Sequence, residues 1–262
     1  MSKTNAGGGR NGRDAGSAGS EVERAYFNDS NIRVEGFNNQ DVQDMVYTIF
    51  GRDLSREEIV SMVSPPDDST VFLADEGDGT LSITVMKPGL IDDMVRHVYL
   101  DRNGKIEMHN DSFFLAMRDS GKVDANGSPI MVSVAKRGYG ATTLARQVVA
   151  LRNLGVQRIT TFAAQGQDMV GYAVWPRLGF NAAIPSGKWP ILARYGAAHG
   201  LDWSHVREYR DLMTSKAGRD AWEKIGWGIH DMSFSTSRSS QNSADLRAYI
   251  LSSDGKVSDP GV

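Results

Sequence analysis

Residues 130–143 read IMVSVAKRGYGATT, and this stretch decides which fold the sequence predicts. Residues 130–135 form an apolar run typical of a buried strand, and residues 136–140 join that run directly to a helix. The helix is predicted over 141–154, and Gly155 stands where a left-handed C-terminal cap belongs. The apolar stripe of this helix consists of Ala141, Leu144, Ala145, Val148, Val149 and either Leu151 or Leu154. A strand, a glycine turn and a helix in this order predict an α/β fold.

The turn between that strand and that helix is rich in glycine. Gly138 and Gly140 allow the backbone to approach a ligand closely, and the first N–H groups of a helix favour a bound phosphate. Arg137 adds a positive charge beside them. Dinucleotide binding is disfavoured because Thr143 stands where the Rossmann pattern needs glycine or alanine, and no Gly-Lys pair has P-loop spacing. The turn therefore predicts a phosphate-bearing ligand, and a tight connection that binds nothing is the alternative.

Upstream of the turn, the pattern first predicts a strand over 32–37 and two helices over 41–50 and 55–63. Ser55 and Glu58 have the spacing of a capping box, which places the start of the second helix. An antiparallel meander is expected next, over 70–74, 81–86, 97–100 and 105–109, with glycine turns at 76–79 and 101–104. Residues 112–117 are ambiguous, and residues 119–128 are expected to form a polar loop.

Downstream of the turn, a strand is predicted over 156–163 and a short helix over 167–178. Beyond this helix, the sequence pattern indicates secondary structure less clearly. Helices are expected over 201–213 and 217–224, and residues 244–251 are expected to form a helix or a strand. Residues 233–242 are rich in serine.

Three positions of the glycine turn resemble motif A of the GNAT superfamily of N-acetyltransferases. That motif reads Gln/Arg-x-x-Gly-x-Gly/Ala, and Arg137, Gly140 and Thr142 fall on its fixed positions. A later segment, 171–180, ends in Leu-Gly-Phe as the family commonly does, and the order of elements over about 30–185 is similar to the family's. The resemblance implies a GNAT-like mixed, largely antiparallel sheet flanked by helices.

This resemblance also implies a division of the chain. Residues 1–30 are expected to be a disordered Gly/Ser-rich leader, since the first twenty contain only Met1 as a large apolar side chain. Residues 31–185 are expected to form a GNAT-like acyl-CoA-binding domain. Residues 186–262 are expected to form a mainly helical C-terminal extension of unknown role.

The resemblance implies acetyl-CoA, or another acyl-CoA, as the co-substrate. The backbone near Val132 and Val134 would pair with the pantetheine amides. The pyrophosphate would be held by the turn residues Arg137, Gly138, Tyr139, Gly140, Ala141 and Thr142. Thr142 departs from the family pattern, and a larger side chain there would crowd the pyrophosphate.

The implied reaction needs a base and an acid. Glu107 and His109 are the candidate bases, because they lie two residues apart on one face of a predicted strand. The family's tyrosine acid aligns with Trp175, whose indole N–H is too weakly acidic, so Tyr172 is the candidate acid. The alternative for each is structural: Glu107 and His109 on a solvated face, and Tyr172 and Trp175 packed under Phe180.

Composition narrows the possible functions further. The chain has 262 residues, a net charge of -3 and no cysteine, which excludes thiolate catalysis, disulfides and cysteine-rich metal sites. No metal-ligand spacing stands out, so no metal is expected. The expected partners are acyl-CoA and an unknown amine acceptor, and a homodimer is a possible assembly. Neither nucleic acid nor a membrane is an expected partner. The expected compartment is the cytoplasm.

Two hypotheses of function follow. The first is an acyl-CoA-dependent N-acyltransferase that moves an acyl group, in the simplest case acetyl, directly from the thioester to an amine. The second is a non-catalytic GNAT-like module that serves in interaction or assembly, and Thr142 and Trp175 are the residues that support it.

Overall fold

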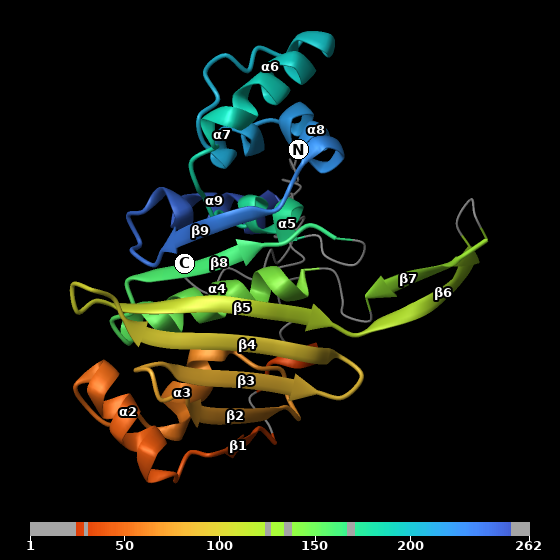
Figure 1. Ribbon diagram of the computed structural model, residues 1–262. Helices are drawn as coiled ribbons and strands as arrows, with labels where there is room; N and C mark the ends of the chain where they lie inside the picture. The colour runs from red at the N-terminus through yellow and green to blue at the C-terminus, as the bar shows by residue number, and fades with distance from the viewer. Residues whose placement is uncertain (1–24, 29–30, 124–126, 134–137, 167–170, 253–262) are drawn as a thin grey trace, which may run out of the picture.

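The computed structural model describes residues 25–28, 31–123, 127–133, 138–166 and 171–252, and these form an α/β fold. A mixed seven-stranded sheet has the order β1-β2-β3-β4-β5-β8-β9, and β6 and β7 form a separate two-stranded sheet (Figure 1). The strands of the main sheet are β1 Arg33–Glu35, β2 Thr70–Asp75, β3 Leu81–Lys87, β4 Ile91–Leu100, β5 Ile106–Leu115, β8 Arg158–Ala163 and β9 Ile229–Ser235. The helices are α2 Gln40–Phe50, α3 Arg56–Val63, α4 Tyr139–Asn153, α5 Gly171–Arg177, α6 Trp189–Ala198, α7 Tyr209–Met213, α8 Lys216–Ile225 and α9 Gln241–Ser252, with a short 3₁₀ turn at Ser186–Lys188.

The two N-terminal helices begin and end where the sequence predicts. The Ser55 hydroxyl accepts from the Glu58 N–H and the Glu58 carboxylate accepts from the Ser55 N–H, which confirms the capping box of α3. Gly51 ends α2 in the left-handed region at φ 68°. These local signals fix the ends of both helices before any packing occurs.

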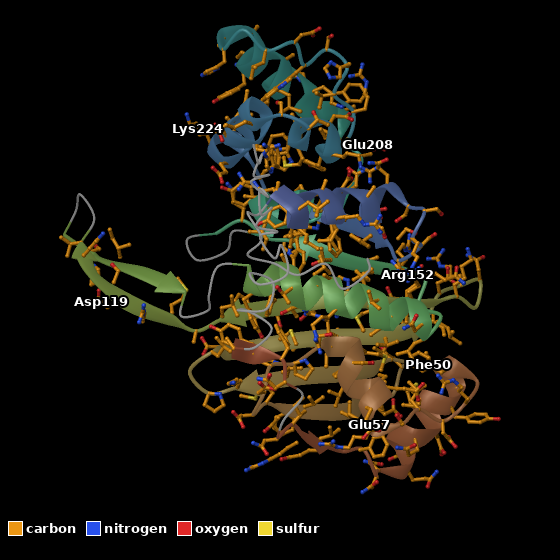
Figure 2. All side chains as sticks on the ribbon, turned by 180° about the vertical axis from the view of Figure 1, so that it is seen from behind. Phe50, Glu57, Asp119, Arg152, Glu208 and Lys224 are labelled. Carbon is orange, nitrogen blue, oxygen red and sulfur yellow. The ribbon has the colours of Figure 1, made fainter. Side chains whose placement is uncertain are left out.

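The core lies between the main sheet and the helices α3 and α4, which pack side by side behind the strands in Figure 1 and in front of them in Figure 2. Each strand sends alternate residues to this face. Met94 and Val98 of β4 and Met108 of β5 are fully buried there with Leu144, Ala145 and Val148 of α4.

Over the residues that the structure describes, the apolar run at 130–135 lies outside the main sheet, contrary to the prediction. Its described part forms β7 (Pro129–Ser133), which pairs with β6 (Met117–Val123) in a hairpin that projects from the body (Figure 1). The predicted polar loop therefore contains part of a strand, β6. β7 pairs with β6 and not with a strand of the main sheet. Ile130 is 39% exposed, so this residue of the run is not buried. The strand that lies beside β8 is β5, which extends to Leu115 through the ambiguous segment.

The C-terminal part adds both helices and a strand. β9 pairs with β8 in antiparallel fashion and forms one edge of the sheet. Helices α6, α7 and α8 lie together beyond that edge, at the top of Figure 1. The helix predicted over 201–213 is wrong for its first part, since only Tyr209–Met213 is helical there. No helix in the described part of the chain is long and apolar enough to cross a membrane.

Candidate functional site

Strands β5 and β8 are parallel neighbours in the main sheet, and they are paired over only four positions. The pairing runs from Glu107 opposite Arg158 to Asn110 opposite Thr161. Beyond Asn110 the pairing of β5 with β4 also shifts, because Val95 pairs with Ser112 while Arg96 pairs with Asn110. Asp111 is therefore the extra residue of a β-bulge. A bulge bends its strand, so β5 leaves β8 at this point.

Helix α4 begins beside the part of β5 that leaves β8. Gly138 precedes the helix with φ 92°, a conformation that favours glycine, and no described side chain caps the first N–H groups. A Cβ built on Gly140 would lie 3.6 Å from Cε1 of Phe113, so the first turn of α4 faces β5. We call residues 111–115 and 138–142 together the β5–α4 corner. It offers backbone N–H groups from a helix start and an unpaired strand edge.

Thr142 does not crowd this corner. Its side chain is buried, and its hydroxyl donates to the Gly138 carbonyl oxygen over 3.1 Å. Gly138, Tyr139, Gly140 and Ala141 also lie in the corner, whereas Arg137 and Val134 lie outside the described residues. Val132 pairs with Arg118 in the hairpin and not with a strand of the main sheet.

Directly beneath the corner lie three buried polar side chains with unpaired atoms: Arg96, Asn110 and Tyr139. Met108 accepts a hydrogen bond from Gln147 of α4, so Asn110, two residues on, faces the same helix. Arg96 is directly opposite Asn110 in the register and shares that face. Each of the three is about 1% exposed. Within the described residues, Arg96 Nε, Asn110 Oδ1 and Nδ2, and the Tyr139 hydroxyl have no hydrogen-bond partner.

The cluster contains a buried cation, and the guanidinium of Arg96 lies over the Phe113 ring, 5.6 Å from its centroid. Arg96 Nη1 donates to the carbonyl oxygens of Val95 and Ser112, but no described carboxylate forms an ion pair with it. Burial lowers the pKa of Arg96 to about 9, with Asp93 and Asp111 opposing that shift from a distance. The guanidinium thus stays charged at neutral pH.

Tyr139 anchors α4 to the core beneath the same corner. Its ring stacks on Phe27 with centroids 5.6 Å apart. Burial raises the pKa of its hydroxyl, which therefore stays protonated. The Thr143 hydroxyl donates to the Tyr139 backbone carbonyl oxygen and also lies close to the phenol hydroxyl, which makes no hydrogen bond of good geometry within the described residues.

Tyr172 and Trp175 on α5 are both held by packing. The Tyr172 hydroxyl donates to the Glu223 carbonyl oxygen of α8 over 3.0 Å, and the Trp175 ring meets Phe180 edge-on at 4.9 Å. A hydroxyl committed to a backbone carbonyl is poorly placed to protonate a ligand. No described hydrogen bond joins Tyr172 to Glu107 or His109.

Glu107 and His109 have different surroundings although they share a strand face. Glu107 is buried and forms an ion pair with Arg158 over 2.8 Å, at the end of the β5–β8 pairing away from the corner. This contact raises the pKa of Arg158. His109 lies next to the bulge, half-buried, with Nδ1 2.9 Å from the Thr160 hydroxyl. Burial lowers the pKa of His109, so its ring is neutral near pH 7 and Nε2 makes no hydrogen bond within the described residues.

Arg96 and Asn110 were missed by the sequence prediction. Arg96 stands between Met94 and Val98 in a run that alternates, and two apolar neighbours at i−2 and i+2 place the residue between them on the buried face. This pattern could have identified Arg96 as a buried residue from the sequence. The bulge at Asp111 has no comparable local signal, because it depends on how β4 and β5 pair.

Comparison with known proteins returned no matching family model, no matching curated protein and no matching solved structure. Within the described residues, no three His, Asp or Glu side chains gather in a group that could hold a metal ion. The properties of the corner and of the cluster beneath it are therefore derived from the geometry of this chain.

Proposed function

We propose that the protein is an acyl-CoA-dependent N-acyltransferase of GNAT-like architecture whose donor binds at the β5–α4 corner. One observation carries this proposal: parallel strands β5 and β8 separate at the Asp111 bulge, beside a helix start with uncapped N–H groups. The helix start suits a pyrophosphate, and the unpaired edge of β5 suits the amides of a pantetheine arm. The order of strands and helices around the corner supports the same interpretation.

The transfer would be direct. The acceptor's amine nitrogen attacks the thioester carbonyl carbon, a C–N bond forms, the C–S bond breaks, and CoA leaves as a thiolate that takes a proton from water. The amine's proton passes to His109, which is neutral near pH 7 and lies beside the bulge. Glu107 is engaged by Arg158 and Tyr172 by the Glu223 carbonyl, so neither carries the proton in this scheme. The chain has no cysteine, so no acyl-cysteine intermediate on the protein is involved.

The second candidate is a GNAT-like module that binds acyl-CoA without turnover. The fixed hydroxyl of Tyr172 favours it, because the candidate acid is not free. The two functions differ in one product. Only the enzyme releases free CoA thiol from acetyl-CoA in the presence of an amine, and a cysteine-free chain gives no background with a thiol reagent.

Titration calorimetry with acetyl-CoA tests the donor site. Gly140→Glu places a carboxylate at the helix start, facing Phe113, and we expect it to weaken binding by at least about a hundredfold through charge repulsion and lost space. Its fold should survive, because acidic residues are favourable in a first helical turn and α4 has none there.

Two matched variants control for size and charge. Gly140→Ala adds a methyl group at ordinary contact distance, and its affinity for acetyl-CoA should lie within about twofold of that of the original chain. Gly140→Gln adds a side chain of the size of glutamate without its charge, so it shows how much of the loss is due to size alone. Absence of acetyl-CoA binding at millimolar concentration would overturn the proposal. Binding that Gly140→Glu leaves unchanged would place the donor elsewhere.

A further inference from the structure

The buried cluster of Arg96, Asn110 and Tyr139 is costly for the folded protein as it stands. A buried cation without a counter-charge and buried polar atoms without partners both oppose folding. Such groups persist where they have another use, and unpaired buried polar atoms gather at sites that bind a ligand or an ion. Asn110 of β5 lies opposite Arg96 of β4 in the register, and Tyr139 of α4 is close enough to Arg96 to act on its charge.

The cluster lies where the acyl end of a donor would reach. Asn110 is the last β5 residue paired with β8, at the point where the strands part, and its backbone carbonyl accepts from the Thr161 hydroxyl. A donor with its pyrophosphate at the start of α4 would extend its other end, the thioester, toward this point. An acyl chain longer than acetyl would then continue into the cluster.

We propose that Arg96, Asn110 and Tyr139 bind a carboxylate at the far end of the acyl group, so that the preferred donor is a dicarboxylic monoacyl-CoA such as succinyl-CoA. This inference rests on the proposed function. Three donors are unpaired, Arg96 Nε–H, Asn110 Nδ2–H and Tyr139 O–H, and an ionised carboxylate accepts from all three. It also supplies the negative charge that Arg96 lacks. Asn110 Oδ1, the one acceptor, takes a hydrogen from a water that enters with the ligand.

A neutral acyl chain of equal length gives the opposite energetics. It would leave the guanidinium and the amide desolvated and unpaired, and sites of this kind reject ligands that lack the matching polar group. Butyryl-CoA has the same carbon count as succinyl-CoA and no charge at the end of its chain. The pair isolates the contribution of the carboxylate.

The experiment measures the affinity of the full chain for succinyl-CoA, butyryl-CoA and acetyl-CoA by titration calorimetry. We expect succinyl-CoA to bind at least about tenfold more tightly than butyryl-CoA. Equal affinities, or a preference for butyryl-CoA, would overturn the inference and leave the proposed function intact provided acetyl-CoA binds. Failure of all three to bind would overturn the proposed function, and this inference with it.

Two variants test the residues themselves. Asn110→Asp keeps the side-chain shape and supplies a carboxylate beside Arg96, and Arg96→Met removes the cation; both should abolish the preference for succinyl-CoA while retaining acetyl-CoA binding. Asn103→Asp, in the exposed β4–β5 turn, adds the same charge as a control and should keep the preference. A preference that persists in Arg96→Met, or that Asn103→Asp also loses, would contradict the assignment. The wild-type comparison decides the question even where a variant fails to fold.

Discussion

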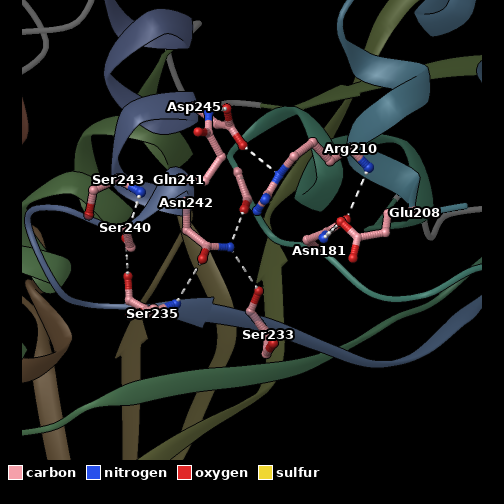
Figure 3. A network of polar contacts seen from close by, with 11 residues as sticks. Asn181, Glu208, Arg210, Ser233, Ser235, Ser240, Gln241, Asn242, Ser243 and Asp245 are labelled. Atoms are coloured by element: carbon pink, nitrogen blue, oxygen red, sulfur yellow. Dashed lines mark hydrogen bonds and ion pairs between the residues drawn. The ribbon is translucent and has the colours of Figure 1, made fainter.

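Two asparagines in this protein, Asn242 and Asn110, show how differently it treats polar groups inside its structure. Asn242 at the start of α9 belongs to a network that joins α9, β9 and the chain around Asn181 (Figure 3). Its Nδ2 donates to the carbonyl oxygens of Gly179 and Ser233, and its Oδ1 accepts from the Ser235 N–H. Asn110 is more deeply buried, and both its side-chain polar atoms lack partners within the described residues.

Neighbouring residues extend the contrast. In the network, the Ser240 hydroxyl donates to the Ser235 carbonyl oxygen and the Ser243 hydroxyl to the Ser237 carbonyl oxygen. Arg210 forms an ion pair with Asp245 over 3.0 Å, although its Nε makes no hydrogen bond of good geometry within the described residues. Beneath the β5–α4 corner, Arg96 forms no ion pair among the described residues, and Asp93 and Asp111 act on it only from a distance. Polar groups that form hydrogen bonds with each other hold elements of the fold together. Polar groups without hydrogen-bond partners do not stabilise the fold in this way. The difference supports the proposal that a ligand binds at the corner.

The largest stability effect should come from the network. Asn242→Leu removes three hydrogen bonds and leaves the Gly179 carbonyl oxygen and the Ser235 N–H without this partner, while the Ser233 carbonyl oxygen still accepts from the Asn181 N–H, so we expect a loss of about 2–3 kcal/mol in the free energy of unfolding. Urea unfolding followed by tryptophan fluorescence measures it. A loss below about 0.5 kcal/mol would show that the network contributes little and would remove the contrast.

The same substitution at the other asparagine should cost far less. Asn110→Leu removes atoms that have no partners and buries apolar surface in their place, so we expect stability unchanged within about 1 kcal/mol, or increased. Succinyl-CoA affinity, in contrast, should fall. If Asn110→Leu destabilises the fold as much as Asn242→Leu, the cluster is structural and the comparison fails.

The smallest effect concerns the pH dependence of stability at His109. Burial lowers its folded-state pKa below the unfolded value of 6.5, so the unfolded chain binds the proton more readily. Stability from this group is present above pH 6.5 and is lost as pH falls through the folded pKa. We expect the original chain to lose less than about 1 kcal/mol between pH 7.5 and about 5.5 on this account.

His109→Gln should flatten that slope, because glutamine does not titrate and keeps a contact with Thr160. His205→Gln, at an exposed position, serves as the control and should leave the slope unchanged. An identical slope in all three proteins would show that the surroundings of His109 differ from those described.

Local signals made much of the fold predictable from the sequence, and the site depended on pairing that they do not encode. The Ser55 capping box and the turn at 101–104 act within a few residues, so the sequence shows them directly. The run at 130–135 is apolar, but whether it joined the main sheet depended on competition with β5 for the place beside β8. Sequence periodicity carries no information on that competition, and the candidate strand was therefore misplaced.

The candidate functional residues likewise fall into two groups, those that local sequence predicts and those that depend on contacts between distant parts of the chain. The glycine turn was predicted from chemistry that belongs to the turn alone, and the structure places it at the start of α4 beside β5. Arg96 and Asn110 acquire their significance only together, through a register in which they lie opposite each other. The fixed hydroxyl of Tyr172 likewise depends on α8, a distant part of the chain.

Hydrogen–deuterium exchange with and without acetyl-CoA tests the central claim most directly, because it reports both regions in one experiment. If the donor binds at the β5–α4 corner, amide exchange should slow in residues 111–115 and 138–142 and stay unchanged in the network around residues 233–245. Slowed exchange confined to the network, or no change in the corner at saturating acetyl-CoA, would contradict the account.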